Sequence, residues 1–401
     1  MSDHNRNCIL FDDPSRDHLL PFAFIRPVAE IRIGILTIRE KWEKWLGVTC
    51  SHHTQDYLQE KYPLVADAEN LLINGAITPN RELVEEIQRL VCGEVLVKDS
   101  LMIAGCFDQP GLETFDGYAP ASYVQKQTNC CFMRVSRPWH IFYYNGPELN
   151  SDFDLITAGR TSVPLNETNN LINAGRIFAE EGAKLNFVTI NATTGPVYIG
   201  KDAEIMEGAL IRGPLALGEG GVIKMGTKIY GPTTIGPFSK VGGEITNSVI
   251  FAYSNKVHEG YLGNSVLGEW CNIGADSNTS NLKNNYTLVK LWSYVTGREE
   301  DTGLQFCGLM MGDYSKCGIN TMFNTGTLVG VSSNIYGAGF PGNFIPSFSW
   351  GGAAGFETYR VDKSFETIGR AMMRRNIELN ETDKEILNSV FRLTDRYRKS
   401  I

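Results

Sequence analysis

The sequence predicts two architectures in one chain, an α/β domain over residues 1–165 and a parallel β-helix over residues 183–340. Two observations carry this prediction. In the second half, aliphatic residues recur at every sixth position, a period that fits neither an α-helix nor an alternating strand. In the first half, short apolar runs alternate with helical stretches, which is typical of a parallel sheet covered by helices. A chain of 401 residues is also long enough for more than one core.

The six-residue period is strict over two stretches. The first ladder is Ile199, Ile205, Ile211, Leu217, Ile223, Ile229, Ile235 and Val241, and the second is Met311, Cys317, Phe323, Val329 and Ile335. Small residues mostly follow four positions later, as at Ala203 and Ser315. A solenoid with one short strand and one turn per side has this period, because its aliphatic residues point inward and its small residues allow the corners. An ordinary β-sandwich would not keep two ladders in register.

Between the ladders, over residues 247–310, the repeat loosens. Leu262, Leu267 and Ile273 keep a fragment of it, whereas residues 284–305 do not fit and carry many charges together with Trp292 and Tyr294. We expect these residues to form an insertion that projects from one face of the solenoid. Such loops often carry function, and a purely decorative loop is the alternative.

The remaining elements are expected from local patterns. Residues 8–11 and 70–74 predict buried strands, residues 31–45 and 81–90 predict helices, and residues 166–182 predict a connecting helix into the solenoid. After Phe340 the repeat stops, and residues 341–401 form a loop and a helical tail. Two helices are expected there, at residues 363–375 and at 380–399, the second capped by Asn380. We expect this tail to cover the open end of the solenoid.

Composition excludes several classes of function. The net charge of −8 argues against nucleic-acid binding and against docking on anionic membranes. No apolar run is long enough to span a bilayer, and the polar N-terminus lacks a signal-peptide core, so we expect a cytoplasmic protein. The nine cysteines are scattered without a Cys-x-x-Cys pair, which favours reduced thiols over a disulfide framework or a zinc site. The sequence therefore predicts no metal site.

A set of polar residues interrupts the repeat between the ladders. It consists of Lys256-Val257-His258-Glu259-Gly260-Tyr261-Leu262-Gly263, then Asn272-Ile273-Gly274-Ala275, then Asn281. This set resembles the acetyltransferase half of the bifunctional N-acetylglucosamine-1-phosphate uridyltransferase/glucosamine-1-phosphate acetyltransferase family, which carries His-x-x-Tyr-Leu-Gly, an Asn-x-Gly-Ala run and a second Asn at similar spacing. The resemblance covers about residues 199–335. It implies a left-handed β-helix and a homotrimer whose active sites lie between subunits.

The resemblance also implies a reaction, acetyl transfer from acetyl-CoA to the amine of a sugar phosphate. His258 would be the general base, because an imidazole commonly titrates near neutrality. Lys256 would hold the phosphate by its charge, and the amides of the motif would orient sugar and base. The expected substrate-binding residues of the solenoid are Lys256, Tyr261, Asn272, Asn281 and Lys283.

The N-terminal region resembles sugar nucleotidyltransferases in the order of its elements but lacks their key residues. The segment from Leu10 to Arg16 has no glycines whose amides could cradle a triphosphate. The family's lysine falls on Val28, and its Mg²⁺-binding aspartate falls on Ala76. Arg16 and Arg26 are the expected phosphate contacts, because guanidinium groups match phosphate oxygens. We expect nucleotidyl transfer to be weak or absent, with Mg²⁺ required only if this domain is active.

Two functions remain open at this point. The first is a transferase of nucleotide-sugar metabolism, whose partners would be a sugar phosphate or nucleotide sugar and an acyl-CoA. The alternative is a non-catalytic protein that binds sugar nucleotides or serves as a scaffold. A metal hydratase built on a similar coil would need several histidines on the solenoid, which offers only His258.

Overall fold

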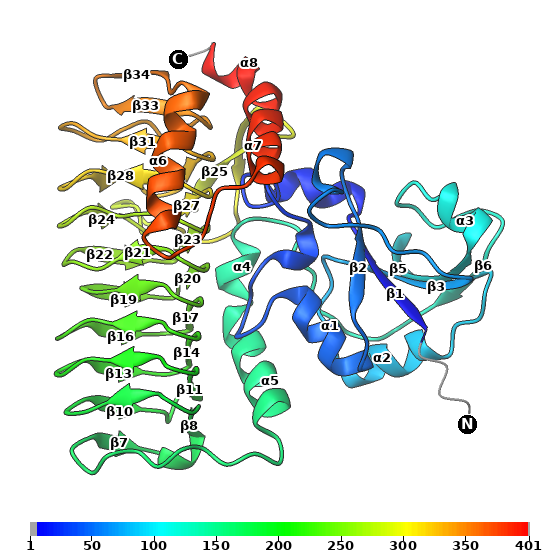
Figure 1. Cartoon of the computed structure of the whole chain (residues 1–401), viewed down its shortest axis with the longest axis horizontal. Coiled ribbons are helices and arrows are strands. Elements are labelled where there is room, and N and C mark those ends of the chain that lie inside the picture. The colour runs from blue at the N-terminus through cyan, green and yellow to red at the C-terminus, as the bar shows by residue number, and fades with distance from the viewer. Residues whose placement is uncertain (1–5, 400–401) are drawn as a thin grey trace. The chain divides into compact units, whose positions relative to one another are not determined.

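The computed structural model describes residues 6–399, which divide into two compact units. The first unit comprises the described residues up to Leu19 together with Ile25–Ile31 and Leu36–Ser136. The second comprises Leu20–Phe24, Arg32–Ile35 and the chain from Arg137 onward. Both predicted architectures, the α/β region and the parallel solenoid, are confirmed (Figure 1). Within the described residues, no helix has the length and apolar character required to cross a membrane.

The first unit is built on a six-stranded sheet with the strand order β2-β1-β3-β5-β4-β6. Its strands are β1 (Asn7–Phe11), β2 (Cys50–His53), β3 (Glu69–Asn74), β4 (Glu94–Lys98), β5 (Leu101–Asp108) and β6 (Val124–Gln127). β1 is parallel to β2 and β3, and β4 is parallel to β6, but β5 is antiparallel to β3 and β4. The sheet is therefore mixed rather than parallel, because Asp99 and Ser100, both with positive φ, fold β4 and β5 into a hairpin.

The helices of this unit are α1 (Ile38–Leu46), α2 (Arg81–Gln88) and α3 (Gln109–Glu113), with 3₁₀ turns at Pro14–Leu19, Val28–Glu30 and Asp56–Leu58. The helix expected at residues 81–90 is confirmed. The helix expected at 31–45 begins only at Ile38, because Thr37 caps it. The Thr37 side chain accepts a hydrogen bond from the Glu40 amide, and the Glu40 carboxylate accepts one from the Thr37 amide.

The solenoid of the second unit has three faces of short parallel strands. One face consists of β7 (Asn170–Ile172), β10 (Thr189–Asn191), β13 (Leu210–Arg212), β16 (Lys228–Tyr230), β19 (Glu244–Thr246) and β22 (Tyr261–Gly263), continued by β24 (Asn278–Thr279) and β29 (Met322–Phe323). The second face consists of β8 (Ile177–Ala179), β11 (Val197–Ile199), β14 (Leu215–Leu217), β17 (Thr233–Ile235), β20 (Val249–Ile250), β23 (Val266–Leu267), β27 (Leu309–Met311), β30 (Thr327–Val329) and β32 (Phe344–Ile345).

The third face consists of β9 (Lys184–Leu185), β12 (Glu204–Ile205), β15 (Val222–Ile223), β18 (Lys240–Val241) and β21 (Asn255–Lys256), then β28 (Lys316–Cys317), β31 (Asn334–Ile335) and β33 (Ser349–Gly352). Isolated bridges from Asn255 to Asn272 and from Asn272 to Lys316 join its two parts. Every residue of both predicted ladders lies in the buried core of the prism. Burial of this apolar column is the main force that holds the coils together. The hand of the coil stays a prediction.

Two expectations at the ends of the solenoid are wrong. Residues 166–182 do not form a helix but hold β7, a 3₁₀ turn at Ala174–Arg176 and β8. Pairing of β7 with β10 and of β8 with β11 prevails over local helix propensity. The repeat also continues past Phe340, because β32 and β33 pair with β30 and β31, and β34 (Gly355–Thr358) then closes the end as a hairpin with β33.

Helices and one hairpin complete the second unit. α4 (His140–Tyr143) and α5 (Asn145–Thr157) precede the solenoid, and the predicted boundary at residue 165 falls between α5 and β7. The two expected C-terminal helices are confirmed as α6 (Val361–Met373) and α7 (Glu381–Leu393), with Asn380 capping α7 through the Asp383 amide. The second helix is interrupted at Thr394, and α8 (Asp395–Arg398) follows. The insertion at 284–305 contains an antiparallel hairpin of β25 (Lys290–Ser293) and β26 (Arg298–Asp301).

Candidate active site

His258 lies on a corner of the solenoid, in the loop between β21 and β22, and its side chain is exposed. The backbone of this loop is fixed. The Lys256 amine donates to the His258 carbonyl oxygen at 2.6 Å, and the Asp276 amide donates to the Glu259 carbonyl oxygen at 3.1 Å. Gly260 has a φ of 115°, and a Cβ there would clash with the Ser277 carbonyl oxygen. The loop therefore presents an accessible imidazole from a rigid backbone, as a catalytic base requires.

Lys256 is not at the surface. It pairs in register with Val241, a residue of the apolar core, and only 2% of its surface is exposed. Burial lowers the pKa of its amine to about 8, against the opposing effect of the Glu259 carboxylate. A side chain directed into the prism lies away from the surface on which a substrate would bind. We therefore revise the expectation that its charge holds the phosphate, and assign its amine to the His258 loop.

Tyr261 and Asn281, 20 positions apart in sequence, meet on the face that carries β22. The Asn281 amide nitrogen donates to the Tyr261 hydroxyl oxygen at 2.9 Å and to the Asn264 side-chain oxygen at 2.8 Å. Burial raises the pKa of Tyr261, although the hydrogen bond from Asn281 opposes the shift, so this phenol stays a neutral donor. Gly263 makes the pairing possible, because a Cβ there would clash with the Tyr261 hydroxyl and lie 2.7 Å from the Asn281 nitrogen.

Asn272 lies on the coil that follows the one carrying Lys256, and it is exposed. Its backbone holds two coils together, because its amide donates to the Ser315 carbonyl oxygen and its carbonyl oxygen accepts from the Cys317 amide. Its side chain therefore stands on a rigid support at the solenoid surface. The structure places Asn272 on the third face and Tyr261 and Asn281 on the first, so the two groups flank the corner that carries His258.

Lys283 lines a polar cavity of about 460 Å³ that the sequence did not reveal. The cavity is lined by Ser280, Leu282, Lys283, Asn284, Asn285, Asn324, Thr325 and Asn343. The Lys283 amine donates to the Leu288 carbonyl oxygen at 3.0 Å, and Ser280 is hydrogen-bonded to Thr325 at 2.8 Å. Amides and hydroxyls of this kind can exchange hydrogen bonds with a polyhydroxylated ligand. The asparagines come from three separate segments of the chain, at residues 284–285, 324 and 343, so only the fold brings them together.

In the first unit, the two aspartates that follow β1 are already engaged. Asp12 accepts hydrogen bonds from the Val28 amide at 2.8 Å and from the Thr54 hydroxyl at 2.6 Å, and it lies 3.4 Å from Arg16. Burial raises the pKa of Asp12 despite the nearby Arg16. Both carboxylate oxygens of Asp12 therefore have partners inside the unit, which disfavours a metal ion at this position.

Asp13 is held by residues that sequence reasoning did not single out. Its carboxylate accepts from Asn74 and from Arg134, both at 2.7 Å, and caps the turn at Ser15. Burial alone would raise the pKa of Asp13, but Ser15 and Arg134 together hold it below the ordinary value. No local pattern pointed to Arg134, which is 121 positions away in sequence.

The two predicted phosphate contacts of this unit are both buried, Arg16 to 5% and Arg26 to 3% exposure. The Arg16 guanidinium also donates to the Tyr57 hydroxyl at 2.9 Å. Burial lowers the pKa of Arg16, but Tyr57 and Asp12 more than offset this effect and raise it. Arg16 therefore contributes to the internal polar network of the unit. Ala76 follows Gly75 after β3, where the family's Mg²⁺ aspartate was expected.

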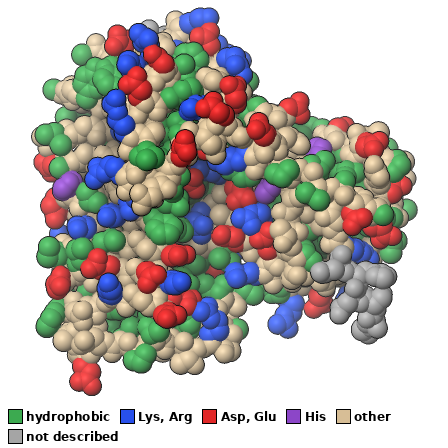
Figure 2. All heavy atoms as spheres, in the orientation of Figure 1, with side chains coloured by type: hydrophobic (Ala, Val, Ile, Leu, Met, Phe, Trp, Pro, Cys, Tyr) green, Lys and Arg blue, Asp and Glu red, His purple; other side chains and the backbone are tan. Residues whose placement is uncertain are grey.

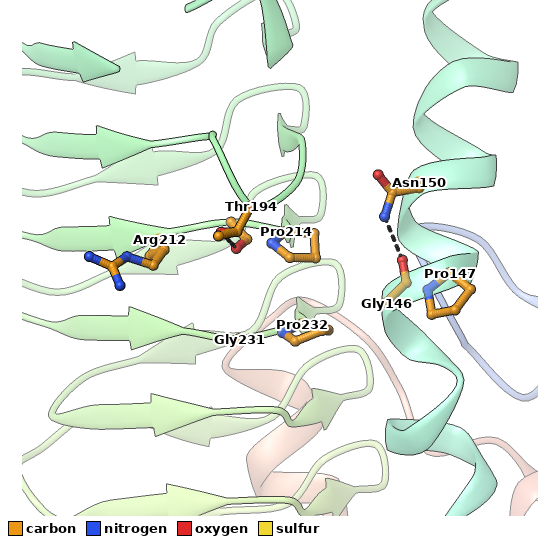
Figure 3. Close-up of a pocket in the computed structure, with 9 residues that line it drawn as sticks. Gly146, Pro147, Asn150, Thr194, Arg212, Pro214, Gly231 and Pro232 are labelled. Atoms are coloured by element: carbon orange, nitrogen blue, oxygen red, sulfur yellow. Dashed lines mark hydrogen bonds between the residues drawn. The ribbon is translucent and has the colours of Figure 1, made fainter. Parts of the chain in front are cut away.

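A second cavity, of about 450 Å³, lies between α5 and the corners of the early coils (Figure 3). Pro147 and Gly146 face Pro214 and Pro232 across it, and Arg212 points away from the helix. The Asn150 amide nitrogen donates within α5, to the Gly146 carbonyl oxygen at 2.9 Å. The labelled groups thus bring no acid or base together, which makes this cavity a weaker candidate. On the face shown in Figure 2, acidic and basic side chains are mixed rather than gathered in one patch.

Comparison with known proteins finds similarity over parts of the chain. Residues 8–161 match the family model described as sugar nucleotidyl transferase. A bifunctional sugar-1-phosphate nucleotidylyltransferase/acetyltransferase of Sulfurisphaera tokodaii is 35% identical over 144 residues, which are 35% of this chain and 35% of the relative. The bifunctional protein GlmU of Methanocaldococcus jannaschii is 34% identical over 87 residues, 22% of this chain and 21% of that protein. The chain thus spans about a third or less of the length of these relatives.

Among solved structures, the UDP-N-acetylglucosamine acyltransferase of Arabidopsis is similar over 58% of this chain and 91% of its own, at 14% identity and a TM-score of 0.23. An α/β domain of the sugar nucleotidyl transferase type, joined to a hexapeptide solenoid, defines a class of two-domain transferase-like proteins. Within that class, parts of the chain are similar to bifunctional proteins of the GlmU type, and residues 8–161 match the sugar nucleotidyl transferase family.

Proposed function

We propose that the chain is a transferase of nucleotide-sugar metabolism whose solenoid moves an acyl group from an acyl-CoA to the amine of a sugar phosphate or nucleotide sugar. One observation carries the proposal, namely an exposed His258 on a rigid loop beside the hydrogen-bonded pair of Tyr261 and Asn281. The names of the relatives, which join nucleotidyl transfer to acetyl transfer, support it.

The chemistry follows from these groups. An ammonium has no lone pair with which to attack a thioester, so a base must remove a proton from the amine as the C–N bond forms. The His258 imidazole takes this proton as the C–S bond breaks, and the resulting imidazolium gives the proton to the departing sulfur, so that CoA leaves as the thiol. Tyr261, Asn272 and Asn281 orient the sugar through hydrogen bonds, and Lys283 meets its phosphate at the polar cavity. The co-substrate is acyl-CoA, and Mg²⁺ is needed only for a nucleotidyl step.

We propose further that three copies assemble so that a neighbour completes this site. Large apolar side chains are exposed at the corner that follows the third face, the same corner that carries His258. They are Phe187 (64% exposed), Met225 (65%), Ile319 (70%) and Tyr336 (46%). A stripe of this kind on one edge favours association with another subunit. Sedimentation should give a trimer at micromolar concentration, and a stable monomer would contradict this assembly.

The decisive experiment measures acyl transfer from acetyl-CoA to amino-sugar phosphates. His258→Ala should lower the rate by about 10²–10⁴-fold and leave the melting temperature nearly unchanged, because the side chain is exposed. Asn272→Ala is the companion variant and should affect both kcat and KM. Acyl transfer that keeps the wild-type rate in His258→Ala across the pH range would refute the assignment of the base.

A second function, non-catalytic binding of a sugar nucleotide by the first unit, is favoured by the engagement of Asp12 and Asp13 and by Ala76. Under this proposal, nucleotide sugars raise the melting temperature, because a ligand of the native state stabilises it. Pyrophosphorylase turnover with UTP or dTTP should be weak or absent. Robust Mg²⁺-dependent turnover that is abolished by Asp13→Asn would show instead that this unit is a nucleotidyltransferase.

A further inference from the structure

Three strands of the first unit bring two thiols and a carboxylate together that lie far apart in sequence. On β5, Cys106 stands opposite Leu71 of β3 and Glu94 of β4. Glu69 opens β3 two positions before Leu71, and Cys92 precedes β4 by two positions. The Gly93 amide donates to the Cys106 carbonyl oxygen at 3.0 Å, and the positive φ of Gly93 turns the chain so that Cys92 reaches Cys106.

The geometry of these three groups fits one metal ion. The sulfur atoms of Cys92 and Cys106 are 3.2 Å apart, and one oxygen of Glu69 lies with both sulfurs inside a span of 4.8 Å. In a tetrahedral zinc site with Zn–S bonds of about 2.3 Å, two sulfurs stand about 3.8 Å apart. The observed spacing therefore needs only small side-chain rotations to admit the ion. Cys106 is buried and anchors the position in the sheet, whereas Cys92 and Glu69 are exposed, so that an ion from solvent can reach it.

The chemistry of the ligands selects the kind of ion. Two thiolates and a carboxylate match a borderline-soft divalent cation such as Zn²⁺, Co²⁺ or Cd²⁺, and they leave a fourth position for water. Without a cation, burial and the neighbouring Cys92 raise the pKa of Cys106 to about 12, with Glu69 adding to the rise and Arg6 opposing it. Tyr123 and Asp108 also face the cluster. A cation must displace the thiol protons, so its binding strengthens as pH rises.

We propose that Glu69, Cys92 and Cys106 form a binding site for a thiophilic divalent cation that ties β3, β4 and β5 together. The site goes beyond the proposed transferase activity, because it lies on the sheet of the first unit and uses no residue of the His258 corner. Among the described residues, these three are the one cluster of His, Cys, Asp and Glu with such spacing. Its role is to stabilise the α/β unit.

A matched control lies in the same sheet. Cys8 and Cys50 stand opposite each other on β1 and β2 with their sulfurs 2.7 Å apart, but both are buried. If two neighbouring thiols were sufficient to bind the cation without a carboxylate, Cys8 and Cys50 would bind it as well. The double variant Cys8→Ser/Cys50→Ser therefore separates a general affinity of paired thiols from the proposed three-ligand site.

The test uses the full-length protein, reduced and stripped with EDTA, and titrated with Co²⁺ or Cd²⁺ at pH 7.5. We expect thiolate-to-metal charge-transfer absorption that saturates at one equivalent, with a rise in melting temperature. Cys92→Ser should abolish the band, and Glu69→Gln should weaken binding by about 10–100-fold or more, since loss of an outer partner alone costs that much. The Cys8/Cys50 double variant should keep the band.

Absence of the band in the reduced protein would overturn the proposal, and so would a band that Cys92→Ser leaves unchanged. Because Cys92 is exposed, its substitution leaves the core intact and the test stays valid even if Cys106→Ser fails to fold. Acyl-transfer activity is measured in parallel. Loss of the band with unchanged activity would leave the proposed function standing.

Discussion

The buried Lys256 gives a prediction whose sign changes with pH. Lys256→Met keeps a side chain of similar length and removes the amine from the core of the prism. At each pH the variant loses the hydrogen bond to the His258 carbonyl oxygen, and at low pH it is also relieved of a buried charge. These two effects oppose each other, and only the second depends on pH.

The magnitudes follow from the pKa. The amine titrates at about 8 in the folded protein, against 10.5 for an ordinary lysine. Since one pKa unit corresponds to about 1.36 kcal/mol, the charged form costs the folded state about 3 kcal/mol. Below pH 8 both folded and unfolded chains carry the charge, so the full cost applies. Between pH 8 and 10.5 the unfolded chain binds more protons than the folded one, so the wild type gains stability as pH rises.

The lost hydrogen bond costs about 1–3 kcal/mol, because the partly buried His258 carbonyl oxygen loses this donor. At pH 7 Lys256→Met should therefore be as stable as the wild type or more stable by about 2 kcal/mol. Near pH 10.5 it should be less stable by about 1–3 kcal/mol. All other groups titrate alike in the two proteins, so their contributions cancel in the difference between the two free energies of unfolding. A change in the sign of this difference with pH is therefore specific to Lys256.

Guanidinium unfolding at pH 7 and at pH 10, followed by tryptophan fluorescence, measures this difference. A protein of two units can unfold in two transitions, and the one that responds to the variant is that of the solenoid. Lys201→Met, which removes an exposed lysine of the same solenoid, is the control for loss of charge alone. If the difference in free energy of unfolding between the two proteins stayed constant from pH 7 to pH 10, the Lys256 amine would not be buried with a lowered pKa.

Two further predictions concern the solenoid core and the motif. Ile229→Asp should unfold the solenoid, because it places an unpaired charge at a position that is 1% exposed; circular dichroism reads the loss, and Lys228→Asp on the exposed side of the same strand should be tolerated. Gly263→Ala should separate Tyr261 from Asn281 and raise KM for the sugar while the protein stays folded. Gly175→Ala, where a Cβ meets nothing within 4 Å, is its control, and an unchanged KM in Gly263→Ala would contradict the role of the pair.

The sequence predicted the solenoid well because its coils obey a simple rule wherever they have three equal sides. From Ile211 to Ile229, residues in register are 18 positions apart. The rule fails where a coil is shorter, since Val241 pairs with Lys256 only 15 positions later. Stepping by six from Val241 passes over Lys256, so its burial could not be predicted, and the lysine was taken for a surface charge.

The candidate site was predictable in part for a related reason. Its polar residues lie close together in sequence, so the spacing of His258, Tyr261 and Asn281 could be recognised as the pattern of the family that the chain resembles. The asparagines of the polar cavity come from three separate segments of the chain, and Arg134 reaches Asp13 from 121 positions away. The cysteines were judged scattered because Cys92 and Cys106 meet only through the pairing of β4 with β5. Contacts between residues that are distant in sequence produce no local sequence pattern, so they could not be predicted.

The interior lysine also explains why this corner is suited to catalysis. The coils around His258 have fewer residues than the 18-residue coils earlier in the solenoid, so the six-residue repeat alone does not determine the conformation of this corner. Lys256, reaching from the core to the His258 carbonyl oxygen, and Gly260, packed against Ser277, fix the loop instead. A buried amine with a lowered pKa lowers stability at neutral pH, and that cost is tolerated where it holds a functional group in place. If Lys256 acts in this way, Lys256→Met should lower kcat for acyl transfer more than it raises KM. A phosphate contact would give the opposite pattern, because its loss weakens binding of substrate and transition state alike.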